Sequence, residues 1–230
     1  MNTLPFPYKI VRSQRRKRTS SISIGKTGNV IITAPVWVPN LILEKFLAQK
    51  SDWVIKQLKK ARPKVIEKLY LAGEKHLYFG EEYPLFFIES NKSKIKVEFI
   101  YNKFRITKKS HTTSTDIKKA MINWYLENGK RIITQKATHF AGKIGASINR
   151  ITIKNVSSIW GSCSHRHNLN FNRKLIMAPH EIVDYVVIHE VSHLLHHNHG
   201  PKFWNQVQVL DPNFKKHRHW LRANSHLLSL

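Results

Sequence analysis

The chain has 230 residues, of which 41% are hydrophobic and 23% charged, a composition typical of folded globular proteins and not of disordered ones. Its 39 basic and 14 acidic residues give a net charge of +25, which fits either a polyanionic partner or a general bias towards lysine. Because no apolar run reaches roughly 18 residues and Cys163 is the single cysteine, we expect a cytoplasmic protein without a disulfide or a membrane partner.

Residues 1–110 are predicted to form a β-rich N-terminal region with one amphipathic helix. Alternating apolar residues indicate strands between residues 8 and 35 and again between residues 70 and 107. The helix is predicted from about Leu41 to Ala61, with Trp53 in its buried stripe.

Residues 111–230 are predicted to form an α+β region that carries most of the histidines. A long helix is expected from about Asp116 to Lys143, followed by strands near residues 151–156 and 169–176. Shorter helices are expected after Pro179 and towards the C-terminus. The boundary near residue 110 is soft, because no Gly/Pro-rich linker marks it.

Apolar residues at helical spacing predict one helix between Pro179 and His197. Within it, His189 and His193 lie one turn apart on the same face, where two imidazoles can bind one metal ion. Glu190 points about 100° further round the helix, where its carboxylate is free to accept a proton from an attacking water. This HExxH arrangement is typical of hydrolytic zinc sites. The alternative is a buried histidine pair satisfied by hydrogen bonds.

A catalytic zinc site needs three protein ligands and one open position. We expect His199 to be the third ligand, because Gly200–Pro201 favours a chain reversal that turns it back towards the other two. His196 and His197 are expected at the surface of the helix, facing solvent or supporting the ligands. Asp211, the only carboxylate downstream, is the weaker alternative.

The segment HEVSHLLHHNHGPKFW, residues 189–204, resembles the YgjP-like metallopeptidases, relatives of the SprT-like and WLM proteases in the zincin superfamily. The segments WGSCS, LNFNRKLIMAP and DYVVIHEVSH match the same family in order, and RSQRRKRTSSISI extends the resemblance towards the N-terminus. The element from His199 to Phe203 is similar to the one that supplies the third zinc ligand in SprT-like proteases. The resemblance therefore favours His199 over Asp211.

The resemblance implies an α+β fold in which the β-rich part, residues 1–110, precedes a zincin-like metallopeptidase domain, residues 111–230, whose HExxH helix packs on a small sheet. It also implies one zinc ion per chain and a protein or peptide substrate. The spacing of the three histidines equals that of metzincins, but His196 stands at their glycine and no methionine follows Met177. A metzincin is therefore not predicted.

The expected reaction is hydrolysis of a peptide bond, in which zinc on the three histidines activates water. Glu190 acts as the general base and passes the proton to the leaving amine. For stabilisation of the oxyanion, the sequence offers only weak candidates in His217, Arg218 and His219, which are more typical of a solvated basic surface.

Other residues near the motif have two interpretations each. Residues 169–175 form either a strand that pairs with an extended substrate or an ordinary core strand. Gly161 is expected to allow either a tight turn or the close approach of another group to the backbone, and Cys163 to be a partly buried residue rather than a ligand. Asp184 or Glu181 is expected either to orient a ligand histidine or to lie in solvent.

Three functions are compatible with the sequence. The first is a cytoplasmic zinc peptidase. The second is a DNA-associated protease of the SprT-like type, in which Arg15, Arg16, Lys17 and Arg18 make non-specific contacts with nucleic acid. The third is a non-enzymatic nucleic-acid-binding protein with a structural zinc. The intact HExxH disfavours the third, because a structural site usually fills its fourth position with protein.

Overall fold

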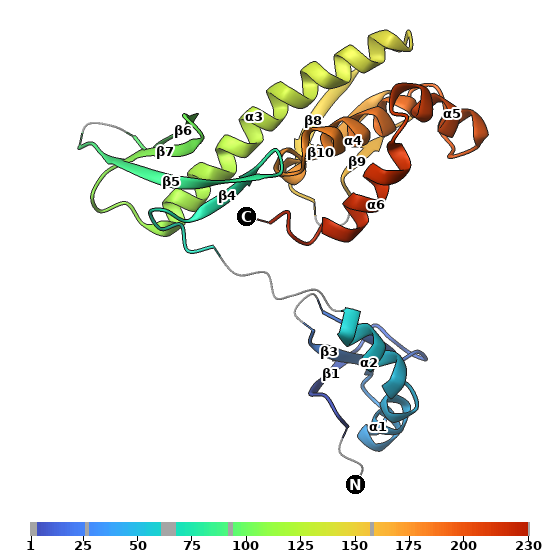
Figure 1. The fold of residues 1–230 in the computed structure, drawn as a ribbon. Helices are drawn as coiled ribbons and strands as arrows, with labels where there is room; N and C mark the ends of the chain where they lie inside the picture. The colour runs from blue at the N-terminus through green and yellow to red at the C-terminus, as the bar shows by residue number, and fades with distance from the viewer. Residues whose placement is uncertain (1–3, 26–27, 61–67, 92–93, 157–158, 230) are drawn as a thin grey trace. The chain divides into compact units, whose positions relative to one another are not determined.

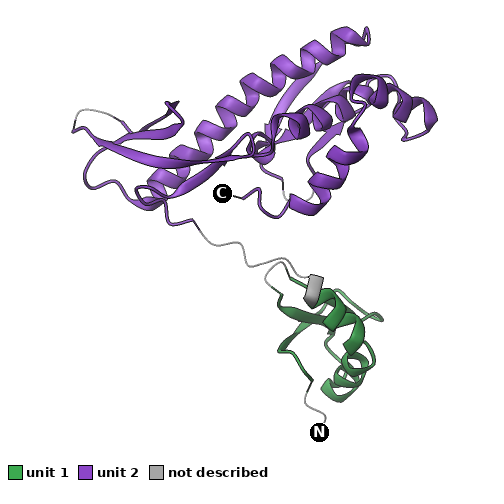
Figure 2. Ribbon diagram, in the orientation of Figure 1, with its two compact units in different colours: residues 1–66 green, residues 67–230 purple. Residues whose placement is uncertain are grey.

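The computed structural model describes residues 4–25, 28–60, 68–91, 94–156 and 159–229 of the chain. Strands dominate the first part and helices the second, so the fold is mixed α+β, as the sequence predicts. The chain divides into two compact units, unit 1 with residues 1–66 and unit 2 with residues 67–230 (Figure 2). Among the described helices, none has the length and apolar character needed to cross a membrane.

Unit 1 is a three-stranded sheet with two helices, and its elements are β1 (Tyr8–Ser13), β2 (Ser21–Ile24), β3 (Val30–Pro35), α1 (Asn40–Gln49) and α2 (Ser51–Lys60). The central strand β3 pairs with β1 in parallel and with β2 in antiparallel orientation. Residues from the sheet and from both helices share one small core, which contains Val30, Ile32, Ala34, Leu43, Leu47 and Val54.

The single helix predicted in this region is two helices in the structure. α1 is capped by Lys50, whose N–H bonds to carbonyls of the preceding turn, and α2 begins at the next residue. A straight 20-residue helix would extend about 30 Å, further than strands that span about 20 Å, so the break keeps both helices over the sheet. Trp53 is 45% exposed, which makes its predicted burial wrong, and Val54 is buried instead. The predicted helix end at Ala61 lies outside the described residues.

Unit 2 holds two sheets with helices around them (Figure 1). Its described elements are β4 (Lys75–Tyr78), β5 (Glu81–Glu89), β6 (Lys96–Ile100), β7 (Lys103–Lys108), α3 (Ser114–Lys143), β8 (Arg150–Lys154), β9 (Gly161–Cys163), β10 (Asn168–Asn172), the 3₁₀-helix η1 (Arg173–Met177), α4 (His180–Ser192), α5 (Pro201–Leu210) and α6 (Phe214–Asn224). α3 contacts strands of both sheets as well as α4, and in Figure 1 it runs along the unit.

The chain divides after residue 66, whereas the sequence predicts a boundary near residue 110. The strands β4 to β7 belong to unit 2 because their aromatic residues pack against α3: the Trp124 ring centroid lies 5.0 Å from that of Phe104 and 5.1 Å from that of Tyr78. The Tyr125 hydroxyl also donates a hydrogen bond of 2.5 Å to the carbonyl of Leu77. These contacts join segments far apart in sequence, which local alternation does not reveal. The extent predicted for the metallopeptidase domain stays a prediction.

The turn between β4 and β5 fixes the start of α4. The N–H groups of Phe79 and Gly80 each bond at 2.9 Å to carbonyls of η1, and the Phe79 ring stacks on His180 with centroids 3.7 Å apart. Gly80 has a φ of +85°, and a Cβ on it would lie 2.7 Å from Cγ of Pro179. Glycine is therefore required here both for the backbone conformation and for close packing on the residue that precedes α4.

The second sheet has the strand order β8-β10-β9, so β10 is central. It pairs with β8 in parallel and with β9 in antiparallel orientation, and its residues Leu169 and Phe171 are buried. Of the two interpretations of this strand, the core strand is confirmed. Because both edges of β10 are already bonded, it has no edge left for a substrate. β9 is an edge strand, and it lies against α4.

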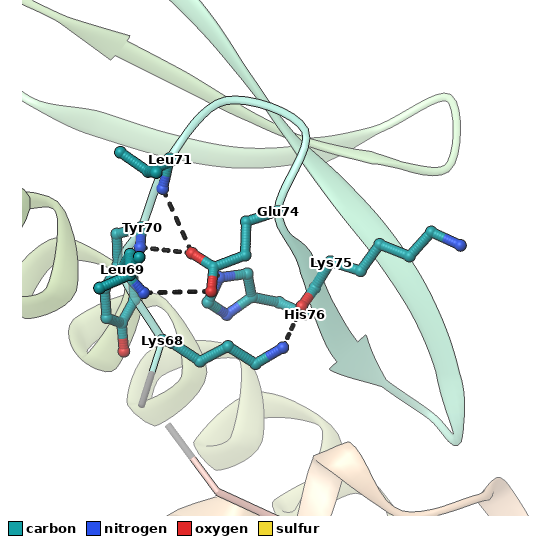
Figure 3. A network of polar contacts seen from close by, with 7 residues as sticks. All are labelled: Lys68, Leu69, Tyr70, Leu71, Glu74, Lys75 and His76. Atoms are coloured by element: carbon teal, nitrogen blue, oxygen red, sulfur yellow. Dashed lines mark hydrogen bonds and ion pairs between the residues drawn. The ribbon is translucent and has the colours of Figure 1, made fainter. Parts of the chain in front are cut away.

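A carboxylate organises the turn that leads into β4 (Figure 3). Glu74 accepts hydrogen bonds from the N–H groups of Leu69 at 3.1 Å, of Leu71 at 3.2 Å and of Tyr70. Next to it, His76 is 2% exposed and packs against the rings of Tyr70 and Phe104. Its Nε2 has no hydrogen-bond partner within the part of the chain that the structure describes. Burial therefore lowers the pKa of His76 to about 4.

We expect the protein to lose stability as the pH falls from 6.5 towards 4. The unfolded chain protonates His76 near its ordinary pKa of 6.5, whereas the folded chain stays neutral there until about pH 4. At pH 5 this difference in pKa lowers the free energy of unfolding by about 2 kcal/mol. His76→Phe keeps an aromatic ring without a titrating group. In urea titrations, the loss of unfolding free energy between pH 7 and pH 5 should therefore be smaller in the variant than in the wild type by about 2 kcal/mol. An identical pH dependence in both proteins would contradict this explanation.

Candidate metal centre

α4 is packed by its neighbours on most of its surface. α3, α5, α6, η1 and β9 all contact it, and its buried apolar residues are Ile182, Val183, Tyr185, Val186, Val187, Ile188 and Val191. Towards its C-terminal end it carries His189 and Glu190, the latter 6% exposed. The polar groups of the HExxH motif are therefore held in a weakly solvated environment, where charges interact strongly.

The imidazoles of His189, His193 and His199 lie together. One ring nitrogen from each can be chosen so that all three atoms lie within 4.8 Å of one another, and the ring centroids are 5.0, 5.0 and 4.7 Å apart. His193 caps α4 with helical backbone angles, φ −68° and ψ −15°, which keeps it one turn from His189. The structure thus brings together the three residues that the sequence predicts as ligands.

His199 reaches the other two histidines through a reversal of the chain. α4 ends at Ser192, earlier than predicted, and α5 follows in a new direction from Pro201. Phe203, in the first turn of α5, packs against all three imidazoles at centroid distances of 5.0, 4.4 and 4.8 Å. Trp204 stacks on His199 at 5.6 Å. An aromatic wall from α5 therefore supports the cluster.

The nitrogen atoms of the cluster fit a metal ion. Nε2 of His199 and Nε2 of His189 face each other at 3.1 Å, a contact that a cation or a shared proton stabilises. Nδ1 of His193 lies 2.9 Å from the carbonyl of His196 and donates to it, which leaves the Nε2 lone pair free for an ion. Burial, followed by the neighbouring histidines, lowers the pKa of His189 to about 3, and burial also lowers that of His193. Both rings are therefore neutral, as metal ligands must be.

The side chain of Glu190 extends from α4 to the edge strand β9. A Cβ added to Gly161 would come within 2.5 Å of Cγ and 2.6 Å of Oε1 of Glu190. The close approach predicted at Gly161 is confirmed, and Glu190 is the group that approaches. Burial raises the pKa of the Glu190 carboxyl to about 8, so this carboxyl can hold a proton near neutral pH.

A cavity of about 310 Å³ opens beside these groups. Its lining consists of the three clustered histidines together with Gly161–Cys163, His165, Glu190 and His197. Cys163 is half-buried, as expected, and burial raises the pKa of its thiol to about 11. Its sulfur is not part of the group of three nitrogen atoms. The site therefore combines three imidazole nitrogen atoms with one carboxyl and open space.

His165 and His197 line the same cavity, with ring centroids 4.5 Å apart. The sequence indicates no role for His165, and it predicts His197 within or at the end of the helix, whereas His197 lies beyond α4. A second histidine-rich segment, SHRHN at residues 164–168, is the signal that could have identified His165. Its position beside the cluster depends on the pairing of β9 with β10.

The remaining polar candidates lie outside the cavity. Nδ1 of His217 lies 2.8 Å from Oδ2 of Asp211. The carboxylate of Asp211, the weaker candidate ligand, is therefore paired with His217. Arg218 lies over the ring of Trp204 at 5.0 Å. Asp184 forms an ion pair of 2.6 Å with Lys136 on α3. The exposed residues Glu181 and His219 do not line the cavity.

Comparison with known proteins gives one family. A family model described as "YgjP-like, metallopeptidase domain" matches residues 18–224. No curated protein matches the chain. Among solved structures, the crystal structure of the metallopeptidase zymogen of Pyrococcus abyssi abylysin is similar over 41% of this chain and 94% of that chain, with 19% sequence identity and a TM-score of 0.37.

The contact between Gly161 and Glu190 can be tested by substitution. We expect Gly161→Ala to lower the free energy of unfolding by about 1–3 kcal/mol, because the new methyl group overlaps the Glu190 side chain. In a double-mutant cycle with Glu190→Ala this cost should largely disappear. Gly142→Ala on α3, where a Cβ meets nothing within 4 Å, serves as the control and should not destabilise the protein. Additive effects at positions 161 and 190 would argue against the contact.

Proposed function

Because the chain belongs to the YgjP-like metallopeptidase family, we propose that it hydrolyses peptide bonds with one zinc ion held by His189, His193 and His199. The zincin-like assignment of its catalytic domain is part of this proposal. The observation that carries the proposal is the convergence of three imidazoles beside the buried carboxyl of Glu190, in one cavity. Three nitrogen donors with an open fourth position match a catalytic rather than a structural zinc site.

Glu190 is the proposed general base. When bound, the ion supplies Lewis-acid polarisation of the scissile carbonyl and acidifies the attacking water. Glu190 accepts the proton of that water at a carboxyl oxygen and delivers it to the leaving amine. Its position in the cavity of the three histidines supports this role, because a base must lie within reach of the reacting water. Contact with Gly161 keeps the carboxyl in place during both proton transfers.

The proposed substrate binds in extended form along β9. This strand is at the edge of its sheet, lies against α4 and lines the cavity with Gly161, Ser162 and Cys163. On its other side β9 has no strand partner among the described residues, so it can form backbone hydrogen bonds with a peptide in the manner of an added strand. A peptide held there passes next to Glu190.

The single cysteine agrees with a reducing, cytoplasmic compartment for this activity.

A structural zinc in a non-enzymatic protein is the less favoured alternative. Such a site would close its fourth position with a protein ligand, and the nearby thiol of Cys163 is outside the group of ligand atoms. A structural role would also leave the buried carboxyl of Glu190 without a purpose, although burial of an ionisable group is costly.

One observation favours a second candidate, a protease that acts at nucleic acid. Residues 1–66 contain 14 basic and two acidic residues, whereas the 164 residues of unit 2 contain 25 basic and 12 acidic ones. The positive charge is therefore about twice as dense in unit 1. A general lysine bias would spread it evenly, so the uneven distribution supports a polyanionic partner for unit 1.

The predicted basic cluster lies next to an exposed aromatic ring in unit 1. Arg15, Lys17 and Arg18 are exposed, while Arg16 donates a hydrogen bond of 2.8 Å to Ser21. The Trp37 indole N–H bonds to the carbonyl of Lys17 at 3.2 Å, and the ring is 69% exposed. Basic side chains beside an exposed indole are suited to single-stranded nucleic acid, because the cations can contact its phosphates and the indole can stack on its bases.

For the peptidase, we expect Glu190→Gln to retain one zinc ion per chain and to lower kcat at least about 100-fold on a protein substrate such as casein, because the general base is lost. Glu181→Gln on the same helix, exposed and remote from the cavity, is the matched control and should retain both zinc and activity. His199→Ala should lower the zinc content measured by mass spectrometry. Full activity of zinc-loaded Glu190→Gln would refute the mechanism.

For the second candidate, we expect the full chain to bind a single-stranded oligonucleotide at about 0.15 M salt. Replacing Arg15, Lys17 and Arg18 by Ala should lower the slope of log K against log salt by about 2, near 0.7 for each lost phosphate contact. Replacing the exposed lysines Lys130, Lys154 and Lys216 of unit 2 removes the same charge and should leave the slope nearly unchanged. Absence of binding by the wild type in fluorescence anisotropy would exclude this candidate.

A further inference from the structure

A second pocket of about 330 Å³ borders the cavity of the metal centre. It is lined by Ser147, Ile148, Asn149, His165, Arg166 and His167. His165 also lines the first cavity, so this residue borders both spaces. None of the functions considered above uses this second pocket.

Hydrogen bonds hold the two walls of this pocket together. One wall is the segment before β8, and the other is the turn between β9 and β10. The Asn149 N–H bonds to the carbonyl of His167 at 3.0 Å, and Nδ1 of His167 lies 3.2 Å from the carbonyl of Ser147. The Asn149 side chain also donates to Asn168 at 2.9 Å. The pocket is therefore preformed, because the strand pairing that builds the sheet also builds its walls.

The pocket has an available cation and no anion. Arg166 is exposed, and none of the ion pairs between described residues involves its guanidinium. None of the six lining residues is acidic. In the adjoining cavity, Glu190 is the single carboxyl that lines the wall. A guanidinium offers five N–H donors in a planar arrangement that matches a carboxylate.

The edge strand β9 leads from the metal centre to this pocket. Its first residue, Gly161, lies against Glu190, and the strand ends at Cys163, just before the turn that carries His165 and Arg166. A peptide paired with β9 advances about 3.3 Å per residue. A side chain a few residues from the scissile bond therefore arrives at the second pocket.

We propose that the pocket formed by Ser147–Asn149 and His165–His167 is a specificity subsite that binds the carboxylate of an aspartate or glutamate of the peptide substrate, with Arg166 as the anion-binding residue. The inference rests on the proposed peptidase function and deepens it, because it names acidic peptides as the substrate class. Arg166 selects the substrate and takes no part in the proton transfers of Glu190.

The test begins with the zinc-loaded wild type and a positional-scanning peptide library. We expect acidic residues to be preferred at one position, a few residues to one side of the scissile bond. For a matched pair of peptides with Glu or Gln at that position, kcat/KM should be about tenfold higher with Glu, chiefly through a lower KM. Arg166→Glu should reverse the preference in favour of Lys at the same position. Arg150→Gln, an exposed arginine of β8 outside both pockets, should retain the preference of the wild type.

Binding gives a readout that does not depend on turnover. With Glu190→Gln as the background, fluorescence anisotropy should show about tenfold tighter binding of the Glu peptide than of the Gln peptide, and adding Arg166→Gln should abolish the difference. Cleavage without an acidic preference, or a preference that survives Arg166→Glu, would overturn the subsite while leaving the peptidase intact. If the zinc-loaded protein cleaves no member of the library, the peptidase function fails and the subsite with it.

Discussion

The burial of α4 is the constraint on which the rest of unit 2 depends. Neighbouring elements, α3, α5, α6, η1 and β9, contact α4, and its C-terminal part nevertheless carries the polar side chains of His189 and Glu190. The local environment resolves this conflict by keeping the histidines neutral and raising the pKa of Glu190 to about 8. Neutral imidazoles are also the form of histidine that can bind a metal ion. The packing of the helix and the chemistry of the site thus have the same physical origin.

The sequence was sufficient for the parts of the site that depend on local geometry. His189 and His193 could be paired because helical periodicity alone places residues four apart on one face. His199 could be added because glycine and proline follow it and favour a change of direction. The close approach at Gly161 was also foreseeable, although the sequence did not identify Glu190 as the group that approaches. The roles of these residues in catalysis stay predictions.

The parts that could not be predicted depend on pairing between distant segments. Whether residues 168–172 form an edge or a central strand is decided by two partners, one on each side, and neither is visible in the strand's own alternation. The position of His165 follows from the same pairing. The division after residue 66 likewise depends on aromatic contacts such as Phe104 with Trp124, which join a strand to a helix. The break between α1 and α2 reflects the short strands beneath them.

The turn at Gly80 contacts segments that are synthesised much later than the turn itself. It packs on Pro179 and bonds to η1, both about one hundred residues later in the chain. The three histidines follow, and α6, which supplies Phe214 and Leu221 to the core around α4, comes last. The wall of the cluster, Phe203, also emerges late. A ribosome-bound fragment therefore lacks part of the frame that positions the histidines until Leu221 of α6 has been made.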